Sequence, residues 1–196
     1  EWITFRRPVD QIYVDDRNIS QEVIMSNSLK VIIDFIVLAI LYVVVFFNKW
    51  RTRSKAKLVV NTLMYIYISL VLYVTLMPIV VSLPFIFNHP YIPMNMMPFA
   101  DYFSGRGDAV RQIILNIIMM MPFGFLLPLV KKQSLLSCLF WTFLFSLGIE
   151  LTQPLVNGIR AADITDLITN TMGGLWGYLL HLVFKPLINK IMCHFE

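Results

Sequence analysis

The chain has 196 residues, of which 58% are hydrophobic and 14% are charged, and its mean hydropathy is +0.70. Soluble domains carry about 25% charged residues, so this composition excludes an ordinary soluble protein and indicates a membrane protein. The net charge of +4 does not indicate nucleic-acid binding, because the Lys and Arg residues lie between apolar segments and form no basic stripe. Two cysteines, Cys138 and Cys193, give neither a disulfide framework nor a metal-ligand spacing.

Residues 1–28 are polar and mixed in charge, and we expect an extracytoplasmic tail or interfacial helix there. Residues 29–196 contain five apolar segments, each near the roughly 20 residues that a helix needs to cross a bilayer. The expected spans are residues 29–47, 58–81, 110–130, 134–151 and 164–184. The segment between the second and third spans is rich in Pro and aromatic residues, which favours a re-entrant or interfacial loop. The sequence therefore predicts an all-α, polytopic membrane protein, a compact bundle of about five transmembrane helices.

Basic residues indicate how the spans are oriented. NKWRTRSKAK, after the first span, carries five Lys or Arg and no acidic residue, and KKQ follows the third span. Lys185 and Lys190 follow the fifth span, so all three basic segments fall on one side of the bilayer. Basic connections stay in the cytoplasm. We therefore expect the N-terminus outside and the C-terminus in the cytoplasm.

Polar and ionisable residues gather at the outer ends of the last three spans. They are Arg111 and Asn116 in the third span, Glu150 and Gln153 in the fourth, Asp163, Asp166 and Asn170 in the fifth, and Arg160 in the loop before it. Because successive spans alternate in direction, these ends meet at one depth near the outer membrane surface. The spacing of three and four residues in the fifth span predicts one shared helical face. Gly173, Gly174 and Gly177 lie deeper near that face, where small residues allow close helix packing.

Ionisable groups so close to hydrocarbon need a partner, water or a function. Asp163 precedes the sequence ITDL, which is typical of a helix N-cap and favours a structural role. Glu150 lies inside the apolar sequence SLGIELTQP, which favours a functional role. Asp34 in the first span either pairs with Lys30 or joins the cluster. The cluster contains no His or Cys, which argues against a zinc site and a Ser-His nucleophile, and no metal or cofactor is expected.

Several segments resemble the VanZ-like family. They are NIIMMMPFGFLLP (Asn116–Pro128), SLGIELTQ (Ser146–Gln153) and RAADITDLITNTMGGLWGY (Arg160–Tyr178), with weaker matches at YVTLMP (Tyr73–Pro78) and NMMPF (Asn95–Phe99). The resemblance implies a small multi-span bacterial membrane protein, and the family's namesake is associated with resistance to glycopeptide antibiotics, teicoplanin more than vancomycin. The characteristic polar positions of the family fall here on Asn95, Asn116, Glu150, Gln153, Arg160, Asp163, Asp166 and Asn170.

Two functions remain open. The first is a binding or envelope-modulating protein whose outer polar pocket, with Asn95 and Arg111 among its residues, holds a lipid-linked cell-wall precursor or a lipidated antibiotic. The second is a membrane enzyme for a lipid-linked envelope substrate, with Glu150 as general acid/base, Asp166 as a second acid or metal ligand, and Arg160 stabilising negative charge. A transporter fits less well, because the polar groups lie at one end of the bundle. The expected partners are membrane lipids, without nucleic acid.

Overall fold

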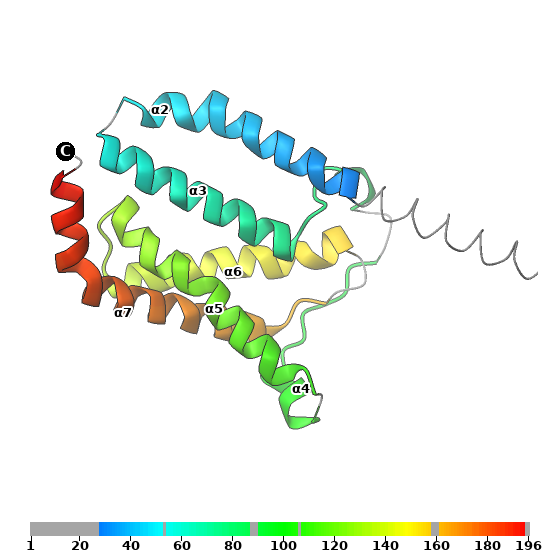
Figure 1. Cartoon of the computed structure of the whole chain (residues 1–196). Coiled ribbons are helices and arrows are strands. Elements are labelled where there is room, and N and C mark those ends of the chain that lie inside the picture. The colour runs from blue at the N-terminus through cyan, green and yellow to red at the C-terminus, as the bar shows by residue number, and fades with distance from the viewer. Residues whose placement is uncertain (1–27, 53, 87–89, 106, 158–160, 195–196) are drawn as a thin grey trace, which may run out of the picture.

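The computed structural model describes residues 28–52, 54–86, 90–105, 107–157 and 161–194, and Figure 1 shows the arrangement of their helices. The predicted tail, residues 1–28, lies outside the described residues except for Ser28. The elements, in chain order, are a helix over Ser28–Trp50 that contains the π-helical turn η1 (Tyr42–Phe47) and ends in α2 (Asn48–Trp50), α3 (Lys55–Thr75), η2 (Leu83–Phe85), α4 (Ala100–Phe103), α5 (Ala109–Val130), α6 (Leu135–Asn157) and α7 (Ile164–His194). The prediction of an all-α bundle is confirmed over these residues.

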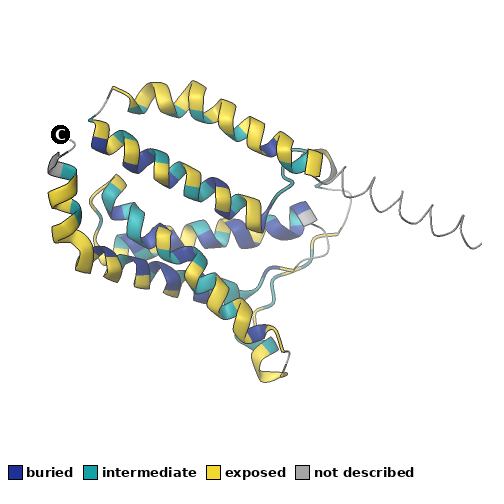
Figure 2. Cartoon of the chain, viewed as in Figure 1, coloured by how far each residue is buried: buried dark blue, intermediate teal, exposed yellow. Residues whose placement is uncertain are grey.

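Four of these helices are long and apolar enough to cross a membrane: Ser28–Trp50, Lys55–Thr75, Ala109–Val130 and Leu135–Val156. Their apolar side chains face outward, as the exposed bands of Figure 2 show along the helix Ser28–Trp50 and along α3. A helix that is hydrophobic around its circumference suits a lipid environment. The chain is therefore a multi-pass membrane protein.

The fifth predicted span, residues 164–184, forms the first part of α7. This helix packs mainly on α5 and α6, as the other long helices pack on their neighbours. It carries Asp166, Asn170 and the glycines, and it is not among the helices apolar enough to count as a span by composition alone. The bundle thus holds four apolar helices and one more polar helix, α7, which packs mainly against α5 and α6.

The C-terminal ends of α3, α6 and α7 differ most from the prediction, and a proline stands near each predicted end. α3 ends at Thr75 instead of residue 81, before Pro78, which has no N–H to continue a helix. α6 continues through Pro154 to Asn157 instead of ending at residue 151, because one missing N–H leaves the rest of the turn intact. α7 continues beyond residue 184 to His194 and contains Pro186, and its C-terminal part turns away from the rest of the helix (Figure 1).

The glycines of α7 form a close contact with α5, as the sequence predicts. A Cβ atom added at Gly173 would overlap the backbone carbonyl of Ile117, and one at Gly177 would overlap that of Met121. On the α5 side, a Cβ at Gly124 would overlap the carbonyl of Gly174. The two backbones therefore touch, and this contact fixes how α7 sits in the bundle.

Asp34 joins the first helix to the segment after α3. Its side chain is 2% exposed, and its two carboxylate oxygens accept the backbone N–H groups of Ile79 (2.6 Å) and Val80 (2.9 Å). The expectation that Asp34 pairs with Lys30 or joins the outer cluster is therefore wrong. The carboxylate instead accepts two backbone N–H groups of the segment that follows α3.

The connection between α3 and α5 folds back onto the start of α7. The Asn95 N–H donates to the Ala162 carbonyl (2.8 Å), and the Ile164 N–H donates to the Asn95 carbonyl (3.0 Å). Phe99, with φ of 57°, adopts a left-handed conformation, and its N–H donates to Thr165 Oγ1 (2.9 Å). This connection therefore lies at the same end of the bundle as the predicted polar cluster.

Candidate ligand-binding site

Asp163 caps the start of α7, as the sequence predicts. Its Oδ1 accepts the Thr165 N–H at 2.7 Å, which is the contact of an N-cap residue. Its Oδ2 accepts a hydrogen bond from Asn95 Nδ2 at 3.1 Å. Asp163 thus caps the helix and holds the connection that precedes α4.

Glu150 lies on α6 and is 2% exposed. Its Oε2 accepts the backbone N–H of Asp163 at 3.0 Å, so the carboxylate joins α6 to the beginning of α7. The sequence SLGIELTQ places Glu150 on an otherwise apolar helix, and the neighbouring helix start supplies the donor that a buried carboxylate needs.

Asp166 and Asn170 join α7 to its two neighbours. Asn116 Nδ2 on α5 donates to Asp166 Oδ1 at 2.7 Å, and Thr169 Oγ1 lies 3.4 Å from the same nitrogen. Asn170 Nδ2 donates to Ser146 Oγ on α6 at 2.9 Å. Polar pairs therefore link α7 to both helices at this end of the bundle.

These residues surround a cavity of about 390 Å³ between α3, α5, α6 and α7. Five predicted site residues line it: Asn116, Glu150, Gln153, Asp166 and Asn170. A volume of about 300–1,000 Å³ is usual for small-molecule sites. The convergence of three helix ends, predicted from the topology, thus brings these polar side chains to one cavity.

Two residues that line this cavity each carry a buried acceptor without a donor. Gln153 Nε2 donates to the Thr75 carbonyl at 3.3 Å, but no group in the described part of the chain bonds Gln153 Oε1. Asn170 Oδ1 likewise has no partner among the described residues. The two side chains are 2% and 1% exposed. Buried polar atoms are nearly always hydrogen-bonded, so two unsatisfied oxygens in one cavity are unusual.

The other predicted site residues lie outside the cavity lining. Asn95 bonds to Asp163, and Asp163 bonds to Glu150, so both connect to the cavity through Glu150. Arg111 is exposed. Arg160 lies outside the described residues.

The sequence analysis missed several residues of the site. Thr75 and Gln112 line the cavity, and Ser146 orients Asn170. Gln112 precedes Asn116 by four residues, and Ser146 precedes Glu150 by four, so helical periodicity could have found both. Thr75 contributes its backbone carbonyl, for which the residue type gives no signal.

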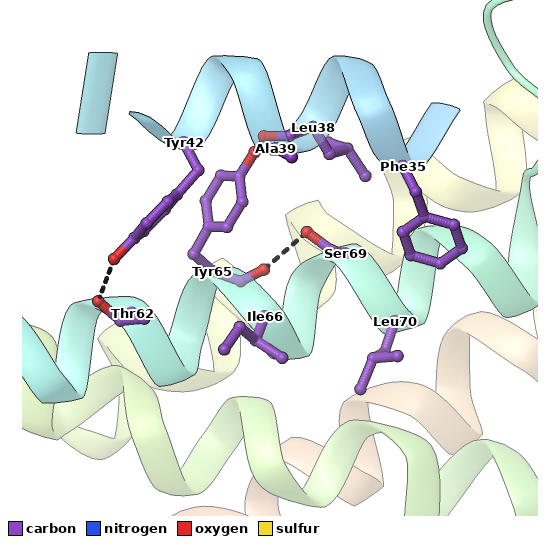
Figure 3. Close-up of a pocket in the computed structure, with 9 residues that line it drawn as sticks. All are labelled: Phe35, Leu38, Ala39, Tyr42, Thr62, Tyr65, Ile66, Ser69 and Leu70. Carbon is purple, nitrogen blue, oxygen red and sulfur yellow. Dashed lines mark hydrogen bonds between the residues drawn. The ribbon is translucent and has the colours of Figure 1, made fainter. Parts of the chain in front are cut away.

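A second hollow, of about 320 Å³, lies between the helix Ser28–Trp50 and α3 (Figure 3). Its polar groups bond one another: Tyr42 Oη with Thr62 Oγ1 (2.8 Å), Tyr65 Oη with the Leu38 carbonyl (2.7 Å), and Ser69 Oγ with the Tyr65 carbonyl (2.9 Å). The hollow therefore presents an apolar surface and needs no polar ligand, unlike the cavity beside Glu150.

Comparison with known families agrees with the sequence resemblance. The family model described as VanZ/LLP1 matches residues 35–185 of the chain. The chain belongs to this family. The VanZ/LLP1 match begins in the first helix and includes all nine predicted site residues, from Asn95 to Asn170.

A curated relative, Protein VanZ of Enterococcus faecium, is 35% identical over 98 residues. The alignment covers 50% of this chain and 57% of that protein, so it spans little more than half of the relative's length. No solved structure matches the chain.

Proposed function

We propose that this chain is a cell-envelope protein that confers or modulates resistance to lipidated glycopeptide antibiotics such as teicoplanin. Membership of the VanZ/LLP1 family and the similarity to Protein VanZ of Enterococcus faecium support the proposal. The observation that carries it is the cavity, because six polar side chains from α5, α6 and α7 line one space of ligand size. In this proposal the cavity is the site through which the protein acts.

The proposed orientation places this cavity at the outer face of the membrane. The opposite end of the bundle carries exposed basic residues: Lys49, Arg51, Lys55, Lys57, Lys131 and Lys132. Basic connections stay in the cytoplasm, which supports an outward-facing cavity, an outer N-terminus and a cytoplasmic C-terminus. Asn116 is the eighth residue of α5, so the site is only about two helical turns, or roughly 10 Å, from the helix end.

An enzymatic role for the same site is the alternative, and the position of Glu150 in the cavity wall favours it. In that case Glu150 exchanges a proton with a lipid-linked envelope substrate, and Asp166 assists. Glu150→Gln separates the two roles, since Gln keeps an acceptor and a similar shape but cannot exchange that proton. A binding protein keeps part of its effect with Gln at this position, whereas an enzyme loses turnover while still holding its substrate.

The proposed function is tested by the drug susceptibility of a sensitive Gram-positive host that expresses the chain. Host cells with and without the chain are compared for teicoplanin, a deacylated teicoplanin derivative and vancomycin. We expect the chain to raise the inhibitory concentration of teicoplanin and to have a smaller effect on the two drugs without an acyl tail. Equal susceptibility with and without the chain, at verified membrane expression, would contradict the proposal.

A further inference from the structure

We infer that the cavity holds the polar head of an amphiphile that enters from the membrane between α3 and α5, and that this head carries hydrogen-bond donors. The inference deepens the proposed function, because it concerns the same site. It does not depend on any antibiotic, so it is tested by binding alone.

The mouth of the cavity is apolar and faces outward. Val74 on α3 and Leu115 and Ile118 on α5 line the cavity and are 68%, 51% and 56% exposed. All three belong to helices that are apolar enough to span the membrane. The cavity is therefore continuous with a surface that faces lipid, and a hydrocarbon chain can extend from it along these side chains without contact with water.

The inner wall of the cavity is polar and buried. Glu150, Gln153 and Asn170 are each at most 2% exposed, and they stand on α6 and α7, behind the apolar residues of the mouth. An apolar mouth that leads to a polar interior matches the order of tail and head in an amphiphile. A fully water-soluble ligand has no apolar part to pack against the residues of the mouth.

The unused groups of this interior are acceptors. Gln153 Oε1 and Asn170 Oδ1 have no donor among the described residues, and both residues line the cavity. Amide oxygens accept hydrogen bonds from O–H or N–H groups. A head with hydroxyl or ammonium groups therefore supplies the donors that these two oxygens lack.

The test measures the retention of amphiphiles by the full chain in phosphatidylcholine nanodiscs, since the phosphatidylcholine head has no hydrogen-bond donor. Three probes share a dodecyl tail: dodecyl maltoside with hydroxyl groups, dodecylammonium with N–H donors, and dodecyltrimethylammonium with the same charge but no N–H. Native mass spectrometry counts the bound probe. We expect retention of a donor-bearing probe, with the maltoside and ammonium arms showing which donor is preferred, and weak retention of the trimethylammonium probe.

Two variants and one matched control locate the binding. Gln153→Met removes the unpaired acceptor at similar length and is expected to weaken retention about tenfold. Val74→Trp fills the mouth and is expected to do the same. Val44→Trp makes the same substitution at a residue of similar exposure, 63%, away from the cavity, and is expected to retain the probe. Thermal unfolding midpoints verify that each variant is folded.

Three results would overturn the inference. The first is no retention of either donor-bearing probe above that of empty nanodiscs. The second is retention of the dodecyltrimethylammonium probe that equals or exceeds that of the better-retained donor-bearing probe, which would assign the binding to charge or to the tail. The third is undiminished retention in a folded Val74→Trp or Gln153→Met variant, which would place the probe elsewhere. Because no drug enters this test, its outcome is independent of the susceptibility assay.

Discussion

The backbone N–H of Asp163 donates to Glu150 Oε2 at a distance of 3.0 Å. This contact joins α6 to the start of α7, and Asp163 in turn caps α7 through its Oδ1. Glu150 therefore holds two helices together and also lines the cavity. Substitutions at Glu150 therefore have to separate its contact with the Asp163 N–H from its role in the cavity wall.

We expect Glu150→Gln to fold and Glu150→Ala to be less stable. Gln retains an oxygen acceptor for the Asp163 N–H, whereas Ala leaves that donor unpaired, at a cost of about 1–3 kcal/mol. The measurement is the unfolding midpoint of each purified variant in the same mild detergent. Equal midpoints for Ala and the parent chain would mean that the contact contributes nothing to stability.

Glycine substitutions test the contact between α5 and α7. Gly177→Ala places a methyl group on the Met121 carbonyl, and we expect a loss of about 1–3 kcal/mol or more. Gly148→Ala on α6 is the matched control, because a Cβ atom there meets nothing within 4 Å. Ala is the better helix former, so this control is expected to be neutral or up to about 1 kcal/mol more stable. Similar unfolding midpoints for the two variants would contradict the close approach of α5 and α7.

The role of Asp34 predicts a contrast with Lys30. Asp34→Leu leaves the N–H groups of Ile79 and Val80 without their acceptor, and we expect a loss of more than about 2 kcal/mol, since hydrogen bonds to charged groups are strong. Lys30→Met is expected to change stability by less than about 0.5 kcal/mol. The measurement is the thermal unfolding midpoint of each variant. Equal losses of stability would contradict the role assigned to Asp34 and favour a pair between Asp34 and Lys30.

The proposed orientation predicts which cysteines an impermeant maleimide reaches on intact cells. Ser104→Cys lies between α4 and α5 at the cavity end, and Thr52→Cys lies in the basic connection between α2 and α3. Both positions are exposed. We expect Ser104→Cys to increase labelling over the parent chain and Thr52→Cys to do so only after the cells are opened. The reverse pattern would place the cavity on the cytoplasmic side.

Alternating topology made the convergence of polar residues predictable. Once the apolar segments are recognised as antiparallel spans, Asn116, Glu150 and Asp166 must lie at one end of the bundle. The spacing of Asp166 and Asn170 gives them one face, and both line the cavity. These inferences depend only on helix geometry and on the polarity of the membrane.

Features that depend on contacts between distant segments were not predictable in the same way. Arg111 shares a helix end with Asn116, but five residues rotate the two side chains by about 140°, and Arg111 is exposed on another side of α5. Asp34 accepts hydrogen bonds from backbone N–H groups after α3. Every residue except Pro has such a group, so the residue types do not reveal the contact. The backbone bridge between Asn95 and Asp163 likewise depends on how a long connection folds back.

The most direct test of the account is the teicoplanin susceptibility of hosts that carry cavity variants at matched membrane expression. The parent chain is compared with Glu150→Gln, Asp166→Asn and Asn170→Leu, and Gly148→Ala serves as the control outside the cavity. The account predicts that the parent and the control protect, and that each folded cavity variant protects less. Full protection by all three cavity variants would contradict it, because the cluster would then hold the helices together and have no part in resistance.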